Sequence, residues 1–302
     1  MGCEDILTRV TRGDVLLCDG AMGTMLHQQG LQPGECPDEW CLSHPDVVKS
    51  IAASYIAAGS DIVETDTFGA NALKLIPFGL ADKAAAINRA GVSLAKSAMA
   101  SRGYVAGSIG PTGHILSQEG GDMSPEQAYD VFREQAVSQA DAGADLLLIE
   151  TMSSLYEAIQ AIKAAKENTS VPVACTFTFQ KSPKGFRTMM GLKPERAAKE
   201  AVNAGAQIVG ANCSSGIEDM VEVAKEMRTA CPDVPILIQP NAGTPVLEDG
   251  KTVFKHTPEY MAARLPELLR AGANIVGGCC GTTPNHIVAM VQAIKRGAAS
   301  FA

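Results

Sequence analysis

The stretch AGADLLLIE at residues 142–150 sets the pattern from which the fold is predicted. Its Ala-Gly pair ends a helical pattern, a short polar turn follows, and an apolar run comes next. Gly often terminates a helix in the left-handed conformation, and an uninterrupted apolar run is typical of a strand buried on both faces. Three more stretches repeat this order: AGSDIVETD at 58–66, AGAQIVGANC at 204–213 and AGANIVGGCC at 271–280.

Four further apolar runs lie between these copies, which makes eight predicted strands. They are VLLCDG at 15–20, YVAGSIG at 104–110, VPVACTFTF at 171–179 and VPILIQPNAG at 234–243. A helical pattern follows each run, over about 44–58, 81–101, 124–142, 154–167, 193–204, 216–229, 257–271 and 284–296.

Eight strand-then-helix units in about 300 residues predict an α/β fold, a single (β/α)₈ TIM barrel. We expect one domain over residues 1–302, with its core at about 15–296. The alternative is a doubly wound open sheet, which should carry a Gly-rich phosphate turn after its first strand. DGAMGTM at 19–25 matches that turn only weakly, because the third Gly is missing. The longer loops at 25–43 and 112–123 are expected on the catalytic face.

Composition narrows the class of protein. The 302 residues are 46% hydrophobic and 19% charged, an ordinary globular balance. The net charge of −8 argues against a nucleic-acid partner. No apolar stretch reaches the roughly 20 residues that a membrane helix needs, and the N-terminal sequence MGCEDILTRVTRGD lacks the pattern of a signal peptide. We therefore expect a cytoplasmic protein without a membrane partner.

Three of the nine cysteines fall at predicted strand ends, where a barrel carries its chemistry. They are Cys213 after the sixth strand and Cys279 and Cys280 after the eighth. Three converging thiolates indicate a soft divalent metal such as zinc, with one coordination position open. Adjacent residues of a strand point to opposite faces, so a metal shared by Cys279 and Cys280 requires a bend, which the surrounding glycines permit.

Other readings of these cysteines stay open on spacing alone. Cys213 fits a small buried hydrophobe. The Cys279–Cys280 pair fits a vicinal redox disulfide. A structural zinc site fits less well, because such sites usually have four protein ligands, often in C-x₂₋₄-C pairs.

The sequence resembles the homocysteine S-methyltransferase family, and most closely the homocysteine-binding domain of the cobalamin-dependent methionine synthases. The matching motifs occur in family order over about residues 15–296. They are LCDGAMGTML at 17–26, AGSDIVETDTFGAN at 58–71, YVAGSIGPTG at 104–113, DLLLIET at 145–151, GANCSSG at 210–216, QPNAGTP at 239–245 and NIVGGCCGTTPNHI at 274–287. GANC followed by GGCCGT is the most specific pair.

The resemblance implies an enzyme that transfers a methyl group to the sulfur of homocysteine and forms methionine. It implies one zinc ion per chain, bound by Cys213, Cys279 and Cys280 as catalytic ligands, with the substrate sulfur in the fourth position. A thiol bound to a metal is deprotonated, whereas a free alkyl thiol with a pKa near ~8.5 is mostly protonated at pH 7. Asn241 matches a family residue that occupies the open position without substrate; the alternative is an ordinary Asn in a Gly turn.

The amino-acid part of homocysteine requires its own contacts. By resemblance, Glu150 binds the ammonium group, and Asp19 is a second candidate, with a cap on the DGAMGT turn as the alternative. For the carboxylate we predict backbone N–H groups in Gly23 and Thr24 and near Ser108, because turns that enter helices offer unpaired donors.

Two further acids, Glu64 and Asp66, are separated by two residues, so a strand would place them on one face, lining the site. The family pattern has Asn at the position of Asp66.

The methyl donor is open. The chain has no Asp-x-His-x-x-Gly motif for ligating cobalamin. If 302 residues is the whole protein, the donor is external, and the resemblance favours a methylcorrinoid protein. Betaine, S-methylmethionine and S-adenosylmethionine are the alternatives, and another thiol, such as coenzyme M, is an alternative acceptor. If 302 residues is not the whole protein, the chain is one domain of a larger enzyme. A non-catalytic zinc-binding barrel that serves as a scaffold is the competing class.

Overall fold

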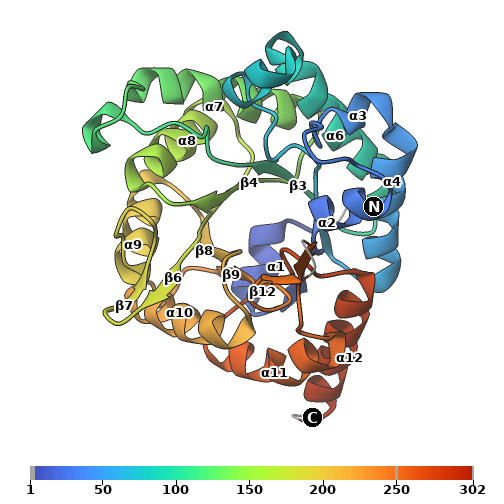
Figure 1. Ribbon diagram of the computed structural model, residues 1–302. Coiled ribbons are helices and arrows are strands. Elements are labelled where there is room, and N and C mark those ends of the chain that lie inside the picture. The colour runs from blue at the N-terminus through green and yellow to red at the C-terminus, as the bar shows by residue number, and fades with distance from the viewer. Residues whose placement is uncertain (1–3, 249–250, 301–302) are drawn as a thin grey trace.

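The computed structural model describes residues 4–248 and 251–300. Within them, eight parallel strands form one sheet in the order β1-β12-β9-β8-β5-β4-β3-β2, and the sheet curls into the barrel of Figure 1. Asp61 donates its N–H to the Leu17 carbonyl oxygen (2.7 Å), which closes the barrel between β2 and β1. The strands are β1 (Leu16–Leu17), β2 (Ile62–Glu64), β3 (Tyr104–Ile109), β4 (Leu146–Met152), β5 (Val173–Phe177), β8 (Ile208–Asn212), β9 (Ile236–Gln239) and β12 (Ile275–Val276).

The long helices form a ring outside the sheet (Figure 1). Local signals set their ends: Ser124 and Gln127 form a capping box at the start of α7, and Gly59 ends α4 in the left-handed conformation. All eight predicted helices are confirmed. They are α4 (Pro45–Ala58), α6 (Ala84–Met99), α7 (Pro125–Asp141), α8 (Leu155–Asn168), α9 (Pro194–Ala204), α10 (Ile217–Ala230), α11 (Pro258–Arg270) and α12 (Pro284–Ser300).

The sequence analysis did not predict the smaller elements. Two antiparallel hairpins follow β5 and β9. The loop expected at 25–43 is partly helical, since it contains the end of α2 and all of α3. The additional elements are α1 (Ile6–Arg12), α2 (Met22–Gln28), α3 (Trp40–Ser43), α5 (Ala72–Leu75), η1 (Ile76–Phe78), η2 (Ala81–Lys83), η3 (Ser117–Glu119), β6 (Gln180–Ser182), β7 (Gly185–Arg187), β10 (Val246–Glu248) and β11 (Lys251–Val253).

Alternate residues of each strand fill the barrel interior, as the period of two requires. Leu16, Leu146 and Leu237 belong to this interior cluster, and Ile6 and Val10 of α1 join it at the end where the strands begin. The intervening strand residues pack against the helices. The interior is therefore a filled apolar core below the carboxyl ends of the strands.

The next inward position of each strand lies at those carboxyl ends, which we call the mouth. Polar residues dominate this layer, so the pleat that buries the apolar core also delivers a ring of reactive groups to the mouth. The layer lies two residues beyond an interior apolar residue of each strand, or four beyond it in β8. It contains Cys18, Glu64, Ser108, Glu150, Thr176, Asn212, Gln239 and Gly277.

Over the described ranges, none of the helices combines the length and the apolar character required to span a lipid bilayer.

Candidate metal centre and substrate site

Three cysteine side chains meet at the mouth. The Sγ atom of Cys280 lies 3.8 Å from that of Cys213 and 4.0 Å from that of Cys279. Tetrahedral zinc with Zn–S bonds of about 2.3 Å separates its sulfur ligands by about 3.8 Å. The three thiols predicted from sequence are thus together at a spacing that fits zinc, and they supply three of four ligands.

The backbone bends where these cysteines require it. β12 ends at Val276, and Gly281 has a φ of 79°, so Cys279 and Cys280 lie in a turn and both reach the cluster. This confirms the predicted bend. On the other side, Cys213 and Ser214 have φ values of 62° and 60°. Non-glycine residues adopt this left-handed conformation at a cost, typically where a site needs it.

The end of β9 and the residues after it connect the loop that carries Cys213 to the loop that carries Cys279 and Cys280. Cys213 donates its N–H to the Gln239 carbonyl oxygen (3.1 Å), and Cys279 donates to that of Pro240 (2.9 Å). Ala242 in turn donates its N–H to the Cys280 carbonyl oxygen (2.9 Å). Segment 239–242 therefore fixes both cysteine loops relative to each other.

The cluster favours one thiolate. Hydrogen bonds from Cys279 and then Cys280 lower the pKa of Cys213 far below that of a free thiol, to about 3. The same interactions raise the pKa of Cys279 and of Cys280, because each holds a proton next to that thiolate. A divalent cation would replace these protons and make all three sulfurs thiolates.

Asn241 lies beside the cluster, as the sequence predicted. Its side chain hydrogen-bonds Cys213 and contributes to the lowered pKa of that thiol. The residue is buried, yet its Oδ1 atom has no hydrogen-bond partner. Buried polar atoms without a partner are costly, so this oxygen is a free acceptor next to the three sulfurs.

Three carboxyl groups face the cysteines from the other half of the mouth. Asp19 and Glu150 are buried and Glu64 is partly buried, and loss of solvation raises the pKa of each to about 8. Repulsion from Asp19 adds to the shift at Glu64, and repulsion from Glu64 adds to the shift at Glu150. Among the described residues, none of the ion pairs formed by lysine, arginine or histidine involves these three acids. The cluster is thus suited to a cation from outside the chain.

Hydrogen bonds hold the predicted ammonium ligand Glu150 on both sides. Ser108 donates its hydroxyl to Oε1 (2.5 Å), and Asn212 donates Nδ2 to Oε2 (2.9 Å). Asn212 also accepts at Oδ1 from the N–H of Thr151, whose φ of 61° is left-handed. Because Asn212 precedes Cys213, it connects the acid to the metal loop.

Asp19 and Glu64 form a second chain of contacts. Glu64 donates its N–H to Asp19 Oδ2 (2.9 Å), and Gln239 donates Nε2 to Glu64 Oε1 (2.7 Å). Cys18 Sγ lies 3.5 Å from the same Glu64 oxygen. The carbonyl oxygen of Gln239 is the acceptor for Cys213, so this chain also ends at a cysteine of the cluster.

Sequence reasoning missed the roles of Asn212 and Gln239. The signal was the strand period: each lies an even number of positions beyond an inward-facing apolar residue, Ile208 and Leu237. Both positions could therefore have been assigned to the mouth layer.

Of the residues predicted to bind the substrate carboxylate, Gly23 and Thr24 lie where N–H groups can be free. Gly23 and Thr24 lie in the first turn of α2, where N–H groups lack intrahelical partners. A Cβ added to Gly23 would meet nothing within 4 Å, so the space beside it is open. Thr24 accepts from the Gly281 N–H at Oγ1 (3.1 Å), which places α2 beside the cysteine turn.

The prediction of free N–H groups near Ser108 is not supported. The Ser108 N–H donates to Thr65 Oγ1 (3.0 Å), and that of Gly110 donates to the Phe68 carbonyl oxygen (2.9 Å). Ser108 remains at the site through its hydroxyl group, which holds Glu150.

The expectation that Glu64 and Asp66 share one face is also not met. β2 ends at Glu64, so the alternation does not extend to Asp66. Burial and repulsion from Asp38 raise the pKa of Asp66. It therefore belongs to a separate acid pair under the loop after β1.

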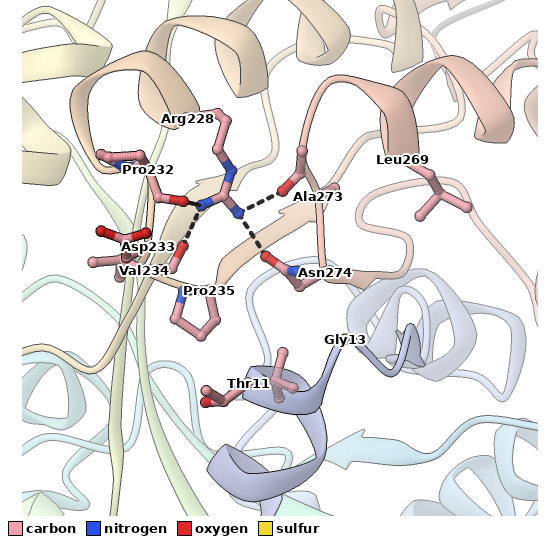
Figure 2. Close-up of a pocket in the computed structure, with 12 residues that line it drawn as sticks. Thr11, Gly13, Arg228, Pro232, Asp233, Val234, Pro235, Leu269, Ala273 and Asn274 are labelled. Carbon is pink, nitrogen blue, oxygen red and sulfur yellow. Dashed lines mark hydrogen bonds between the residues drawn. The ribbon is translucent and has the colours of Figure 1, made fainter.

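The opposite end of the barrel holds a hollow of about 310 Å³ between α1 and the loops that enter β9 and β12. Figure 2 shows Arg228 in its wall, directed at neighbouring oxygens. Its guanidinium donates to the carbonyl oxygens of Pro232, Val234 and Gly272 and to Asn274 Oδ1. Arg228 therefore stabilises the loops at this end of the barrel.

The comparison with protein families agrees with the arrangement at the mouth. The homocysteine S-methyltransferase profile matches residues 16–294, nearly the whole chain. The chain belongs to the homocysteine S-methyltransferase family. The resemblance predicted from the motifs is confirmed, and the protein is an enzyme of this family with a cysteine triad consistent with a zinc site.

Curated relatives include two mycobacterial methionine synthases. The protein from Mycobacterium leprae (strain TN) is 30% identical over 301 residues, which cover 93% of this chain and 24% of the relative. The protein from Mycobacterium tuberculosis (strain ATCC 25618 / H37Rv) is 31% identical over 304 residues, 93% of this chain and 25% of the relative. The chain thus spans about a quarter of the length of these relatives.

Solved structures of the homocysteine methyltransferase MmuM from Escherichia coli have the same fold. Its metallated form superposes with a TM-score of 0.79 at 24% identity, covering 94% of this chain and 97% of MmuM. Its oxidized form gives a TM-score of 0.77 at 24% identity, with 94% and 99% covered. These likenesses confirm the (β/α)₈ barrel.

Proposed function

We propose that this chain is a zinc-dependent thiol methyltransferase that converts homocysteine to methionine, with residues 1–302 as a single homocysteine-binding domain. One observation carries the proposal: three thiols at zinc spacing face three carboxyl groups that pair with no lysine, arginine or histidine of the described residues. A substrate that carries a thiol and an ammonium group matches both halves of the mouth.

Cys213, Cys279 and Cys280 would hold the zinc. When bound, zinc supplies a substrate thiolate at neutral pH and leaves it nucleophilic, because three cysteine thiolates already neutralise the metal charge. Asn241 fits a role at the open position, since its free Oδ1 lies beside the cluster and substrate sulfur would displace it.

The remaining residues orient the substrate. Glu150 and Asp19 accept from the ammonium group, and Ser108 and Asn212 keep Glu150 in place. The N–H groups of Gly23 and Thr24 bind the carboxylate at the start of α2. A fixed amino-acid end directs the sulfur at an incoming methyl carbon, and orientation of this kind supplies much of a methyl-transfer rate. The new sulfur–carbon bond forms as the donor–methyl bond breaks, with its electron pair left on the donor.

For the methyl donor we infer a separate protein segment that carries a methylcorrinoid. Within the described ranges, each large apolar side chain that remains exposed lies in a segment on the mouth side of the barrel, between a barrel strand and the second turn of the helix that follows it. These side chains, which we call the apolar rim, are Leu42, Ile76, Phe78, Ile115, Tyr156, Met189, Met190, Leu247 and Val288.

A protein that presents its methyl group at the mouth would cover these exposed side chains, whereas a small donor would leave them in water. The length of the methionine synthase relatives beyond the matched quarter is compatible with further domains. Betaine, S-methylmethionine and S-adenosylmethionine need only the mouth itself.

The test is one sample of reduced protein, assayed for metal and then for turnover. We expect about one zinc per chain and methionine formation from homocysteine with a methylcorrinoid protein, more slowly with free methylcobalamin. Turnover with betaine, S-methylmethionine or S-adenosylmethionine alone would replace the donor assignment. One zinc without any binding of homocysteine would favour the scaffold, and absence of zinc would overturn the proposal.

A further inference from the structure

The segment Phe254–His256 touches all three loops of the proposed metal centre. It follows β11 and precedes α11, and sequence analysis gave it no role. One loop carries Cys213, the second carries Asn241, and the third carries Cys279 and Cys280. Contacts from residues 254 and 256 reach each of them.

The ring of His256 is wedged between two glycines that follow these residues. A Cβ added to Gly216 would come within 2.7 Å of His256 Cε1, and one added to Gly243 within 2.8 Å of Cδ2. The two glycines also adjoin, since the added Cβ of Gly216 would lie 3.3 Å from Gly243 Cα. The imidazole therefore fills the notch where the Cys213 loop meets the Asn241 loop.

The rest of the segment reaches the third loop. A Cβ on Gly281, the residue after Cys280, would lie within 2.2 Å of the Phe254 ring. The backbone of His256 donates its N–H to the Ala242 carbonyl oxygen (2.9 Å). Its own carbonyl oxygen lies 3.0 Å from Nε2 of His286, in the first turn of α12.

A brace from α11 holds the histidine ring from behind. The rings of His256 and Tyr260 are in contact, with centroids 4.3 Å apart. The Tyr260 hydroxyl donates to Glu218 in the first turn of α10, and Arg264 pairs with the same carboxylate (2.9 Å). The wedge is thus fixed to the helix that starts directly after the Cys213 loop.

The Cys213 loop needs such support. Cys213 and Ser214 are both left-handed, a conformation that persists only where the surroundings impose it. The ring of His256 packs on Gly216, two residues further along, and thereby limits how the loop can relax.

We infer that Phe254–His256 is a positioning element of the metal centre. The rings of Phe254 and His256 set the separation between the loop that carries Cys213 and the loop that carries Cys279 and Cys280. The inference rests on the proposed zinc function. His256 acts through its shape. Its Nδ1 atom is buried against Gly216 without a hydrogen-bond partner, and His256 belongs to neither of the two groups of potential metal ligands among the described residues.

The first test measures zinc affinity by competition with a chelator, together with the visible absorption of the cobalt-substituted protein. His256→Ala should weaken zinc binding about 10- to 100-fold, the usual cost of losing support around a ligand, and should alter the cobalt spectrum. His256→Leu keeps the bulk without either nitrogen, so it should stay within about threefold of the wild type. His114→Ala, in an exposed loop, is the matched control and should change neither.

A compensating pair separates positioning from loss of folding. Gly216→Ala should lower zinc affinity because its methyl group meets the His256 ring, and Gly216 has an ordinary φ of −77°. Adding His256→Ala makes room for that methyl group. The double variant should therefore bind zinc more tightly than the two single effects predict, which is the signature of direct coupling.

Three results would overturn the inference alone: wild-type zinc affinity in His256→Ala, equal losses in His256→Leu and His256→Ala, or additive effects in the double variant. A wild-type protein that binds neither zinc nor cobalt would instead overturn the proposed function, and the inference with it.

Discussion

The two halves of the mouth bring their acidic groups together in different ways. On the metal side, three thiols lie on two irregular loops, and left-handed Cys213 and Ser214 bring one of them into place. On the acid side, Glu64 ends β2, Glu150 lies in β4 directly before left-handed Thr151, and Asp19 directly follows β1. Among the described residues, no lysine, arginine or histidine pairs with these three acids.

The difference teaches how one barrel recognises a two-headed substrate. Strand pleats bring Glu64 and Glu150 to the mouth from separate strands, and burial then raises their pKa values. Sulfur ligands must converge on one point, which a pleat cannot achieve for adjacent residues. The metal side therefore places its ligands on loops outside the strands, whereas the acid side keeps Glu150 within β4, with one left-handed residue, Thr151, after it.

The largest effect should come from the metal side. Cys213→Ser removes one of three sulfur ligands. Replacing a residue that only supports a ligand typically lowers metal affinity by up to about 100-fold, so the loss of the ligand itself should lower zinc affinity by more. Metal content after dialysis against a chelator measures this. Cys231→Ser is the control, because this cysteine lies at the end of α10, outside the cluster. Equal zinc loss in both variants would remove the ligand assignment.

Glu150→Gln should affect only the acid side. Losing a hydrogen bond to a charged group costs about 1.5–3 kcal/mol, so the Kd for homocysteine should rise about 10- to 150-fold. Zinc content should be unchanged. Calorimetric titration of the zinc-loaded variant measures the Kd, and Glu167→Gln, exposed on α8, is the control. If affinity is retained, Glu150 is not an ammonium ligand.

The pH dependence of stability should report the buried acids. Burial raises the pKa of Glu64 to about 8, above its value of about 4.3 in an unfolded chain. The folded state therefore binds this proton more tightly, and its stabilisation is lost as pH rises between these values. In Glu64→Gln, the decrease of the unfolding free energy with rising pH should be smaller by up to about 1.4 kcal/mol per pH unit.

Urea unfolding of the metal-free, reduced wild type and Glu64→Gln proteins between pH 5 and roughly 8.5 checks this slope. The comparison at matched pH cancels the cysteine titrations. Parallel curves would mean that folding does not raise the pKa of Glu64, and Glu64 would then be ionised at neutral pH.

The smallest effect should come from the apolar rim. Most single contacts in an interface are worth less than 1 kcal/mol, so Met189→Ser should raise the KM for a methylcorrinoid protein less than about fivefold. Turnover with free methylcobalamin should stay the same. Leu7→Ser, on α1 at the far end, is the control. An equal change with both donors would show that the rim does not bind the donor protein.

The sequence predicted the barrel and the triad for physical reasons. Repeated Ala-Gly ends and apolar runs define each unit locally, and glycines around Cys279 and Cys280 signal the bend. Contacts between distant loops carry no such local signal. The wedge of His256 against Gly216 and Gly243 depends on where three loops meet. The occupied N–H of Ser108 depends on Thr65, 43 residues away.

The central claim is that three cysteines bind zinc and leave its fourth position for the substrate. X-ray absorption at the zinc edge, before and after homocysteine is added, tests it most directly. We predict three sulfur ligands at about 2.3 Å plus one oxygen or nitrogen, changing to four sulfur ligands with substrate. An unchanged ligand set at saturating homocysteine would contradict the account.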